Sequence, residues 1–421
     1  MPELNNRQNR TPADLRRANA KEVLRVLRDS GPLRISDISD RTGISRPTVT
    51  QLVASLEADA LVEYVDDRTA GTEGPRLGRP ARLVRFRAET GYVLGAEVGP
   101  SRLLLVVMDM AGTIVTGREA RPASARGMDD LVTELQSEIE ALLAAAEIAH
   151  GMVRRLVVGV PGLVDHRNRT LAQGSRLVQW NSDSHRTRLR ERFGFPVFFE
   201  NDVNLAVIGE SRRGAARGLG TVAYVHWGTR VGAGILVSGR LHAGASSAAG
   251  EIGHMVLDSP HTSRARHSSD QGTFEQAVGA AAIAALGRAA ARRPDGQALR
   301  ALAGGDAASV RATTVFAAAQ AGDPVARAIA DDFITRFAVG LAPLILVLDP
   351  DIVVLGGGVV QGGTWVLDVL RQKLVSRTLL PPPLALSSLH NQAAAVGGAC
   401  MALEAIESDL LPASSSQPEH R

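Results

Sequence analysis

The stretch Gly250-Glu251-Ile252-Gly253-His254 is the most informative part of this chain of 421 residues. Two further acidic stretches frame it, Glu200-Asn201-Asp202-Val203-Asn204 before it and Gly272-Thr273-Phe274-Glu275 after it. Carboxylates, an amide and an imidazole that converge on one site suit a ligand rich in hydroxyl groups, because neighbouring hydroxyls need acceptors and donors in fixed geometry. The three stretches therefore predict a pocket for a polyhydroxyl ligand.

Together these stretches resemble the sugar pocket of the ROK family (repressors, open reading frames, kinases). The resemblance covers residues 90 to 405 and implies a two-lobed, actin-like ATPase domain of the α/β class. The pattern of the chain agrees, since strands and helices alternate from Gly91 onward. We expect a helix at Asp129–Ala149 and strands at Tyr92–Val98, Leu103–Met108, Thr113–Thr116, Leu156–Val160, Thr221–Tyr224, Val231–Val237 and Ile352–Leu355.

The resemblance assigns sugar contacts to Asn201, Asp202, Glu251, His254 and Glu275, and it implies a sugar or sugar phosphate as effector. In kinases of the family, the Asp of the Glu-Asn-Asp segment takes the proton of the attacked hydroxyl, and Asp202 matches it. A carboxylate there is equally useful for binding without chemistry, and Asn201 could instead cap a helix. We favour sugar contacts for this pair because the other three residues match as well.

The phosphate-binding parts of the family pattern are altered in this chain. The first family loop reads Asp-x-Gly-Gly-Thr, and Glu97-Val98-Gly99-Pro100-Ser101 stands in its place. Pro100 removes an N–H that a phosphate would use, and Glu97 lengthens the carboxylate arm. In the second loop, Arg230 replaces a common glycine, where it could obstruct a nucleotide or bind an anionic ligand. We therefore predict no catalytic residue and no cofactor; an active ATP-dependent sugar kinase is the alternative.

The zinc motif of the family is the clearest departure. Family members usually place Cys-Gly-Cys-Gly-x-x-Gly-Cys after the Gly-His pair, whereas this chain has Arg266-His267-Ser268-Ser269-Asp270-Gln271-Gly272-Thr273 there. Cys400 is the single cysteine, so a tetrahedral sulfur site is excluded and we predict no bound metal. An imidazole site made by His254, His261 and His267 is the minor alternative.

The first part of the chain has the pattern of a helix-turn-helix. Apolar spacing predicts helices at Ala18–Arg28 and Ile35–Thr42, and then a third helix capped by Ser45. Two helices, a Gly-containing turn and a third helix are the order found in DNA-binding modules. The outward positions of the third helix carry groups that contact base edges or phosphates, namely Ser45, Arg46, Thr48 and Gln51.

A wing is predicted behind the third helix by two strands, Leu61–Val65 and Ala81–Phe86. Its tip is rich in Gly and Pro and could place Arg79 in a minor groove; an ordinary linker is the alternative. Residues 1–87 carry 16 Lys and Arg against 12 Asp and Glu, although the whole chain has a net charge of only +3. This local excess suits the phosphate backbone of DNA, and a solvated basic face explains it nearly as well.

The remaining composition points to a cytoplasmic protein. No apolar run reaches the roughly 18 residues of a membrane helix, no signal peptide is evident, and one cysteine fits a reducing compartment. We expect a winged helix-turn-helix at 1–87, a ROK sugar-binding domain at 88–407 and a disordered tail at 408–421. The chain is interpreted as a sugar-responsive regulator, a repressor of carbohydrate-metabolism genes, that binds a double-stranded DNA operator as a homodimer or homotetramer. A DNA-binding protein with a vestigial pocket remains a third possibility.

Overall fold

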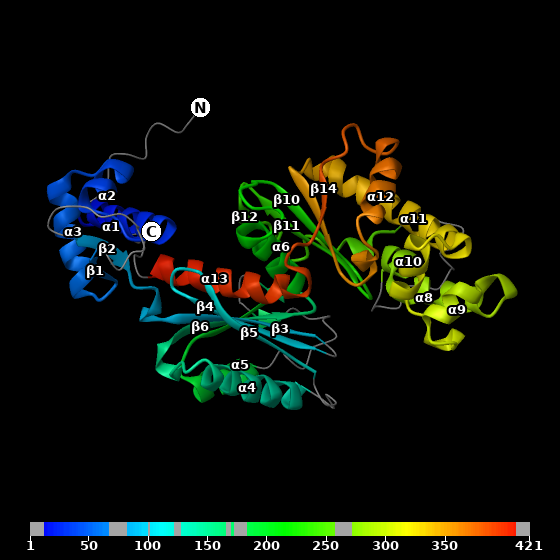
Figure 1. Cartoon of the computed structure of the whole chain (residues 1–421), viewed down its shortest axis with the longest axis horizontal. Coiled ribbons are helices and arrows are strands. Elements are labelled where there is room, and N and C mark those ends of the chain that lie inside the picture. Colours follow the sequence, from blue (N-terminus) through cyan, green and yellow to red (C-terminus); the bar gives the residue numbers. More distant parts are fainter. Residues whose placement is uncertain are drawn as a thin grey trace, which may run out of the picture.

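A computed structural model describes residues 12–66, 82–99, 102–121, 128–165, 170–171, 183–256 and 272–409. A small N-terminal domain is followed by a larger domain with two lobes, each built on its own five-stranded sheet (Figure 1). None of the helices in the described part of the chain is long and apolar enough to cross a membrane.

The N-terminal domain contains the predicted helices and wing. Its elements are α1 (Pro12–Ser30), α2 (Ile35–Thr42), α3 (Arg46–Ala58), β1 (Val62–Asp66) and β2 (Arg82–Phe86). The helix predicted at Ala18–Arg28 is longer at both ends. Leu15, Arg16 and Arg17 have good helix propensity and extend its start, and at the other end it continues through Asp29 and Ser30 to Gly31, whose φ is 75°. The wing strands pair antiparallel, and Leu33 forms a bridge to Val84 that ties the connection between α1 and α2 to the wing.

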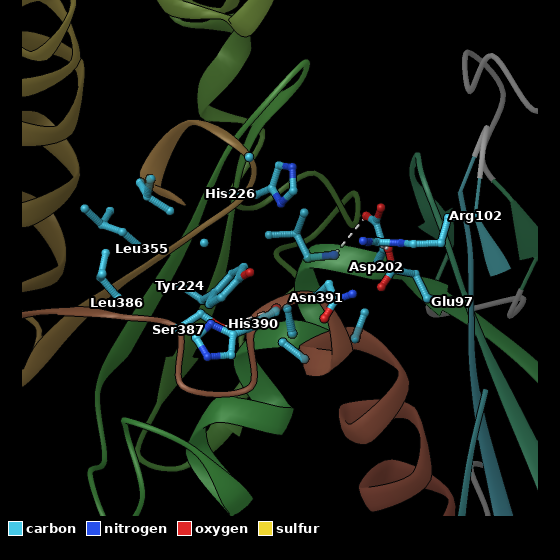
Figure 2. A pocket seen from close by; sticks show the side chains of 18 of the residues that line it. Glu97, Arg102, Asp202, Tyr224, His226, Leu355, Leu386, Ser387, His390 and Asn391 are labelled. Atoms are coloured by element: carbon cyan, nitrogen blue, oxygen red, sulfur yellow. Dashed lines mark hydrogen bonds and ion pairs between the residues drawn. The ribbon is translucent and has the colours of Figure 1, made fainter. Parts of the chain in front are cut away.

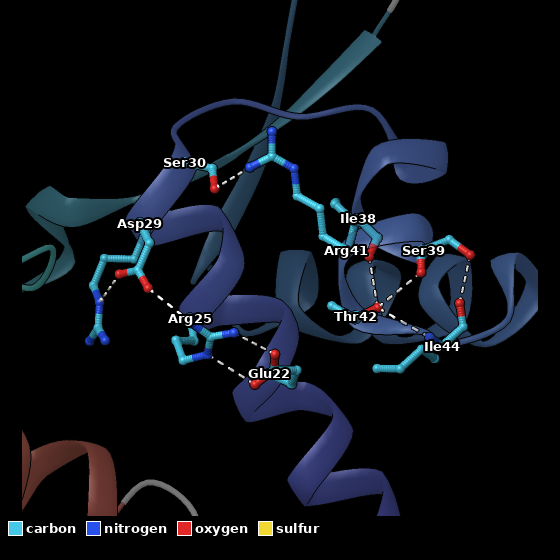
Figure 3. Close-up of polar contacts among 10 residues, drawn as sticks. Glu22, Arg25, Asp29, Ser30, Ile38, Ser39, Arg41, Thr42 and Ile44 are labelled. Carbon is cyan, nitrogen blue, oxygen red and sulfur yellow. Dashed lines mark hydrogen bonds and ion pairs between the residues drawn. The ribbon is translucent and has the colours of Figure 1, made fainter.

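Short-range hydrogen bonds fix the turn before α3 (Figure 3). Gly43 ends α2 with a φ of 69°, in the left-handed region that favours glycine. The Thr42 hydroxyl donates to the Ile38 carbonyl at 2.7 Å, and the Ser39 hydroxyl donates to the Ile44 carbonyl at 2.6 Å. Ser45 then caps α3 by accepting from the Thr48 N–H, as predicted. The inward residues of α3, Val49, Leu52, Val53 and Leu56, are buried.

The two sheets of the larger domain repeat one strand order. The first runs β5-β4-β3-β6-β9 and the second runs β12-β11-β10-β13-β14. In each sheet the first three strands along the chain pair antiparallel and the next two join in parallel. The strands are β3 (Tyr92–Val98), β4 (Leu103–Asp109), β5 (Ile114–Ala120), β6 (Val153–Val160), β9 (Val197–Asn201), β10 (Val222–Trp227), β11 (Val231–Val237), β12 (Arg240–Leu241), β13 (Ile352–Gly356) and β14 (Leu384–Leu386). A short hairpin, β7 (Val164–Asp165) with β8 (Thr170–Leu171), follows β6.

Helices cover the outer face of each sheet. On the first sheet these are α4 (Met128–Ala145) and α5 (Asp183–Phe193). The second lobe carries α7 (Thr273–Val278), α8 (Ala280–Ala291), α9 (Gln297–Leu302), α10 (Ala312–Gln320), α11 (Pro324–Leu348) and α12 (Trp365–Val375). The core of the second lobe includes Trp227, which stacks on Phe337 with ring centroids 3.9 Å apart.

Two helices lie between the sheets and join the lobes: α6 (Asp202–Arg213) and α13 (Ala393–Asp409) (Figure 1). Their backbones approach so closely that glycine is required at the contact. A Cβ on Gly397 would lie 1.8 Å from the Leu205 carbonyl oxygen, and one on Gly95 of β3 would lie 1.9 Å from the Ala395 carbonyl oxygen. The first sheet, α13 and α6 are therefore packed as one stack.

Some predicted boundaries are wrong. The helix predicted to run to Ala149 ends at Ala145, because Glu147 has a φ of 56°, which no right-handed helix accommodates. The strand expected at Thr113–Thr116 runs over Ile114–Ala120, since pairing with β4 continues beyond the apolar residues. Helix α13 continues to Asp409, past the predicted start of the tail at Ser408; residues 410–421 lie outside the described part of the chain.

Candidate functional site

The candidate site centres on the N-terminus of α6. Strand β9 ends at Asn201 and α6 begins at Asp202, so both side chains emerge between the lobes. The side-chain Oδ1 of Asn201 accepts from the Asn204 N–H at 2.9 Å, and its Nδ2 donates to the Gly162 carbonyl at 3.0 Å. Asn201 is thus the helix cap that its position suggested, and it retains a second lone pair on Oδ1 and a second N–H on Nδ2 for a ligand.

Asp202 has two other carboxylates as neighbours. Burial, together with the negative charges of Glu97 and Glu251, raises the pKa of Asp202 to about 7. Its Oδ1 accepts a hydrogen bond from the adjacent Val203 N–H at 2.9 Å. A carboxyl group that titrates near neutral pH suits either proton transfer or a hydrogen bond to a hydroxyl.

A second group of side chains lies on the neighbouring loops of the second lobe. Glu275 on α7 is 7% exposed, and its Oε2 accepts from the Val231 N–H at 3.1 Å. Its Oε1 has no hydrogen-bond partner and lies 3.6 Å from Nη1 of Arg230. Burial raises the pKa of Glu251. The charge of Glu275 also raises this pKa, whereas those of His254 and Arg230 lower it. The four side chains therefore influence one another electrostatically.

The structure therefore brings all five predicted sugar-site residues to one region, with His254 exposed at its margin. Arg230 also belongs to this group. The sequence placed it in a phosphate loop and gave no sign that it pairs with Glu275, because the two residues are distant along the chain.

Two cavities adjoin the N-terminus of α6, and Val203 lines both. The smaller one, about 20 Å³, is lined by Asn201 and Glu251 among others and has room for about one water molecule. The larger one, about 600 Å³, is in the range of ligand pockets and includes Asp202. There is thus little open space between Asn201 and Glu251, while the space beside Asp202 is open.

The large cavity is polar at one side and apolar at the other. Figure 2 shows Glu97, Arg102 and Asp202 gathered together, with Leu355 and Leu386 across the cavity. Nη2 of Arg102 donates to Oε1 of Glu97 at 3.1 Å. Burial raises the pKa of Glu97, and Arg102 opposes that shift.

Several polar groups in this cavity were not predicted, because they come from segments far apart in the sequence. They are Arg102, Tyr224, His226, Ser387, His390 and Asn391. Burial lowers the pKa of His226 to about 4, so its imidazole is neutral near pH 7. The end of β13 and the turn after it supply Gly356, Gly357 and Gly358 to the lining.

The described lining residues offer a nucleoside triphosphate little positive charge. Among them the single guanidinium, that of Arg102, donates to Glu97, and Asp202 adds a second carboxylate. A triphosphate would bring several negative charges beside both carboxylates, so it would need a divalent cation between them. Pro100 and Ser101 of the first phosphate loop lie outside the described residues.

Among the described residues, no group of three or more His, Cys, Asp and Glu side chains could hold a metal ion. Cys400 is buried on α13, and burial raises the pKa of its thiol to about 11. His261 and His267 lie in residues 257–271, outside the described part, so the imidazole alternative stays a prediction.

The predicted DNA-reading positions lie on the accessible face of α3. Ser45, Arg46 and Gln51 are exposed, and Thr48 is half-buried with its hydroxyl 2.8 Å from that of Ser45. Thr50, exposed on the same helix, was not among the predicted contacts. Arg79 lies in residues 67–81, outside the described part.

Comparison with known families matches each of the two domains to a family model. A family model described as "ROK family" matches residues 93–405. The chain belongs to the ROK family. A second model, "MarR family", matches residues 5–71, so a MarR-type winged helix precedes the actin-like ROK domain.

Curated relatives include both repressors and enzymes. The xylose repressor of Bacillus subtilis is 26% identical over 58% of this chain, and the match spans 62% of that repressor. A putative xylose repressor of a Caldicellulosiruptor species is 23% identical over 94% of this chain and 97% of its own length. The glucokinase of Streptomyces coelicolor is 29% identical over 75% of this chain and 98% of its own length.

A solved structure shares the whole architecture. The ROK family transcriptional regulator described as a homolog of the E. coli MLC protein superposes with a TM-score of 0.72 at 21% identity. It covers 94% of this chain and 98% of its own. This likeness extends the shared fold over both domains.

Proposed function

We propose that this protein is a sugar-responsive transcriptional repressor of carbohydrate-metabolism genes, acting in the cytoplasm as a homodimer or homotetramer. Ser45, Arg46, Thr48 and Gln51 of α3 contact double-stranded operator DNA, and Arg79 of the wing enters the adjacent minor groove. Asn201, Asp202, Glu251, His254 and Glu275 hold the sugar effector. The xylose repressors among the relatives make a pentose one of the first sugars to test.

One contact path carries the proposal, because it links the sugar site to the DNA-binding domain. Helix α6 begins at Asp202 and ends at Arg213, whose guanidinium donates to the Gly112 carbonyl in the turn after β4. In the same turn, the Met110 N–H donates at 3.0 Å to the carbonyl of Ala88, in the segment that joins the wing to β3. A movement of α6 can therefore be passed through these two hydrogen bonds to the segment that carries the winged helix.

The small space between Asn201 and Glu251 supports a population-shift mechanism. A cavity of about 20 Å³ cannot hold a sugar ring, so a ring that contacts both of these residues requires the lobes to rearrange around α6. The rearranged state moves the winged helix, and in an oligomer this changes the spacing of two reading helices. The ligand then favours one arrangement and changes DNA affinity.

A sugar kinase with a DNA-binding head is the second candidate. The pKa of Asp202, about 7, suits a general base, and a glucokinase is among the relatives. The Arg102–Glu97 and Arg230–Glu275 pairs speak against it, because they occupy both phosphate loops.

The DNA-binding part is tested by fluorescence anisotropy with duplexes from the region upstream of the protein's own gene, at several salt concentrations. We expect an inverted repeat to bind with an affinity that falls steeply as salt rises. Arg46→Ala and Gln51→Ala should each weaken binding by about 1–3 kcal/mol without changing the melting temperature. Arg293→Ala, an exposed arginine in the second lobe, is the matched control. Normal operator binding by a chain that starts at Arg87 would contradict the assignment.

A further inference from the structure

The large cavity beside the sugar pocket is the feature that the proposed function leaves unexplained. Its volume of about 600 Å³ leaves room for more of a ligand than the group that contacts Asp202. The cavity extends to the glycine turn after β13. Because Val203 lines both cavities, the two lie on either side of one point, the first turn of α6. Asp202, the residue before Val203, lines the large cavity, so a ligand that contacts Asp202 from the proposed sugar site would extend toward that cavity.

The described charges of the large cavity do not favour an anion. Nη2 of Arg102 donates to Oε1 of Glu97 at 3.1 Å, and Asp202 adds a second acidic group. Burial lowers the pKa of His226, so its imidazole is neutral near pH 7. A phosphate group on the sugar would therefore approach two carboxylates and would share the Arg102 guanidinium with Glu97.

The uncharged groups of the cavity suit a carbohydrate. Tyr224, His226 and Asn391 provide donors and acceptors for hydroxyl groups, while Leu355 and Leu386 provide an apolar wall for the C–H face of a ring (Figure 2). Gly356 keeps the space next to Tyr224 open, since a Cβ there would lie 1.9 Å from the tyrosine hydroxyl.

We propose that the large cavity binds a second, uncharged sugar unit, so that the preferred effector is a disaccharide or longer oligosaccharide that passes Asp202. This inference rests on the proposed function and specifies its ligand class. The first ring contacts Glu251 and Glu275 once the small pocket opens, and the second ring lies between Asp202 and the Gly356–Gly358 turn.

Gly358 allows a variant that fills only the large cavity. It lines this cavity, has an ordinary φ of −68°, and a Cβ there would meet no atom within 4 Å. Gly358→Leu should therefore fold normally and shorten the cavity. The matched control is Gly151→Leu, at an exposed glycine outside the cavity whose Cβ would also meet nothing within 4 Å.

The experiment is calorimetric titration of the full chain with D-xylose and xylobiose, D-glucose, cellobiose and gentiobiose, glucose 6-phosphate, and ATP with magnesium. Each ligand is also added to the protein–DNA complex in an anisotropy assay. We expect at least one disaccharide to bind about ten-fold more tightly than its monosaccharide. Gly358→Leu should remove that gain, whereas monosaccharide binding should change less than about two-fold and Gly151→Leu should change neither.

Other outcomes separate the inference from the function. Monosaccharides that release DNA and bind as tightly as the disaccharides overturn the inference and leave the proposed function standing. Tighter binding of glucose 6-phosphate or of ATP, weakened by Gly358→Leu, assigns the cavity to a charged ligand and also overturns it. If no sugar binds or changes DNA affinity, the proposed function itself is wrong.

Discussion

The two lobes share a strand order but differ in what their first hairpins bring to the space between them. The β3–β4 hairpin places Glu97 and Arg102 at the large cavity, 3.1 Å apart. The β10–β11 hairpin sends Arg230 to the sugar site, 3.6 Å from Glu275. In the kinases that this domain resembles, both hairpins are phosphate loops. Here each has an arginine close to a carboxylate, and these pairs support the proposal of a regulator over that of a kinase.

The largest expected effect concerns catalysis. A hairpin that still binds phosphate would contradict the proposed difference between this chain and the kinases. We expect no sugar-dependent ADP release above background, whereas kinases typically turn over about 1–100 times per second. A coupled assay with the sugars named above measures it. Ordinary turnover that is lost in Asp202→Ala would instead favour the kinase interpretation.

The stability of the protein should be most sensitive to added side-chain volume in the stack of the first sheet, α13 and α6. Gly397→Ala places a Cβ 1.8 Å from a backbone oxygen of α6, so helix α6 or α13 must shift. We expect a loss of about 1–3 kcal/mol in the free energy of unfolding, measured by urea denaturation. Gly304→Ala gives the comparison for a glycine with open space around it, although its positive φ adds its own strain. Equal stability of Gly397→Ala and wild type would mean that the helices are not in close contact.

The two arginine–carboxylate pairs should differ in strength. Glu275 is the more buried acid, with its side chain 7% exposed against 16% for Glu97, so the loss of its arginine leaves a less hydrated charge. We expect Arg230→Ala to cost about 1 kcal/mol of stability and Arg102→Ala less, since both guanidinium groups are partly hydrated. Double-mutant cycles with Glu275→Gln and Glu97→Gln isolate each pair. A larger coupling at Arg102 would reverse this order.

A further expected effect is the pH dependence that Asp202 contributes at the junction of the two hairpins. Its pKa is about 7 in the folded chain against 3.8 without the fold, so the folded state binds the proton more tightly. Ionisation through that window therefore lowers stability as the pH rises. Asp202→Asn should raise the melting temperature more at about pH 8 than at about pH 5.5. The same gain at both pH values would mean that folding does not raise the pKa of Asp202.

Local signals in the sequence predicted the parts that local forces determine. Ser45 and Asn201 were recognisable as caps because a cap needs only its own side chain and the N–H groups that follow it. The inward face of α3 follows from helical spacing alone. By contrast, the contact of α6 with α13 depends on Gly397, whose requirement for glycine is set by a helix far away along the chain.

The sequence named the members of the proposed sugar site but not how they pair. The five predicted sugar contacts came from a family pattern, and nothing in that pattern indicates that Arg230 reaches Glu275. The large cavity was missed because its lining, including Arg102, Tyr224 and Asn391, comes from both lobes and from the segment before α13. Such a site exists only after folding, since no short stretch of sequence contains it.

The central claim is that a sugar bound between the lobes controls how the winged helix binds DNA. It is tested most directly by the affinity of the full chain for its inverted repeat, measured by anisotropy with and without saturating sugar, in the wild type and in Glu251→Ala. We predict that sugar lowers wild-type affinity by about 5- to 150-fold, whereas Glu251→Ala binds DNA normally and does not respond. A normal response in Glu251→Ala would contradict the account, because it would place the effector elsewhere.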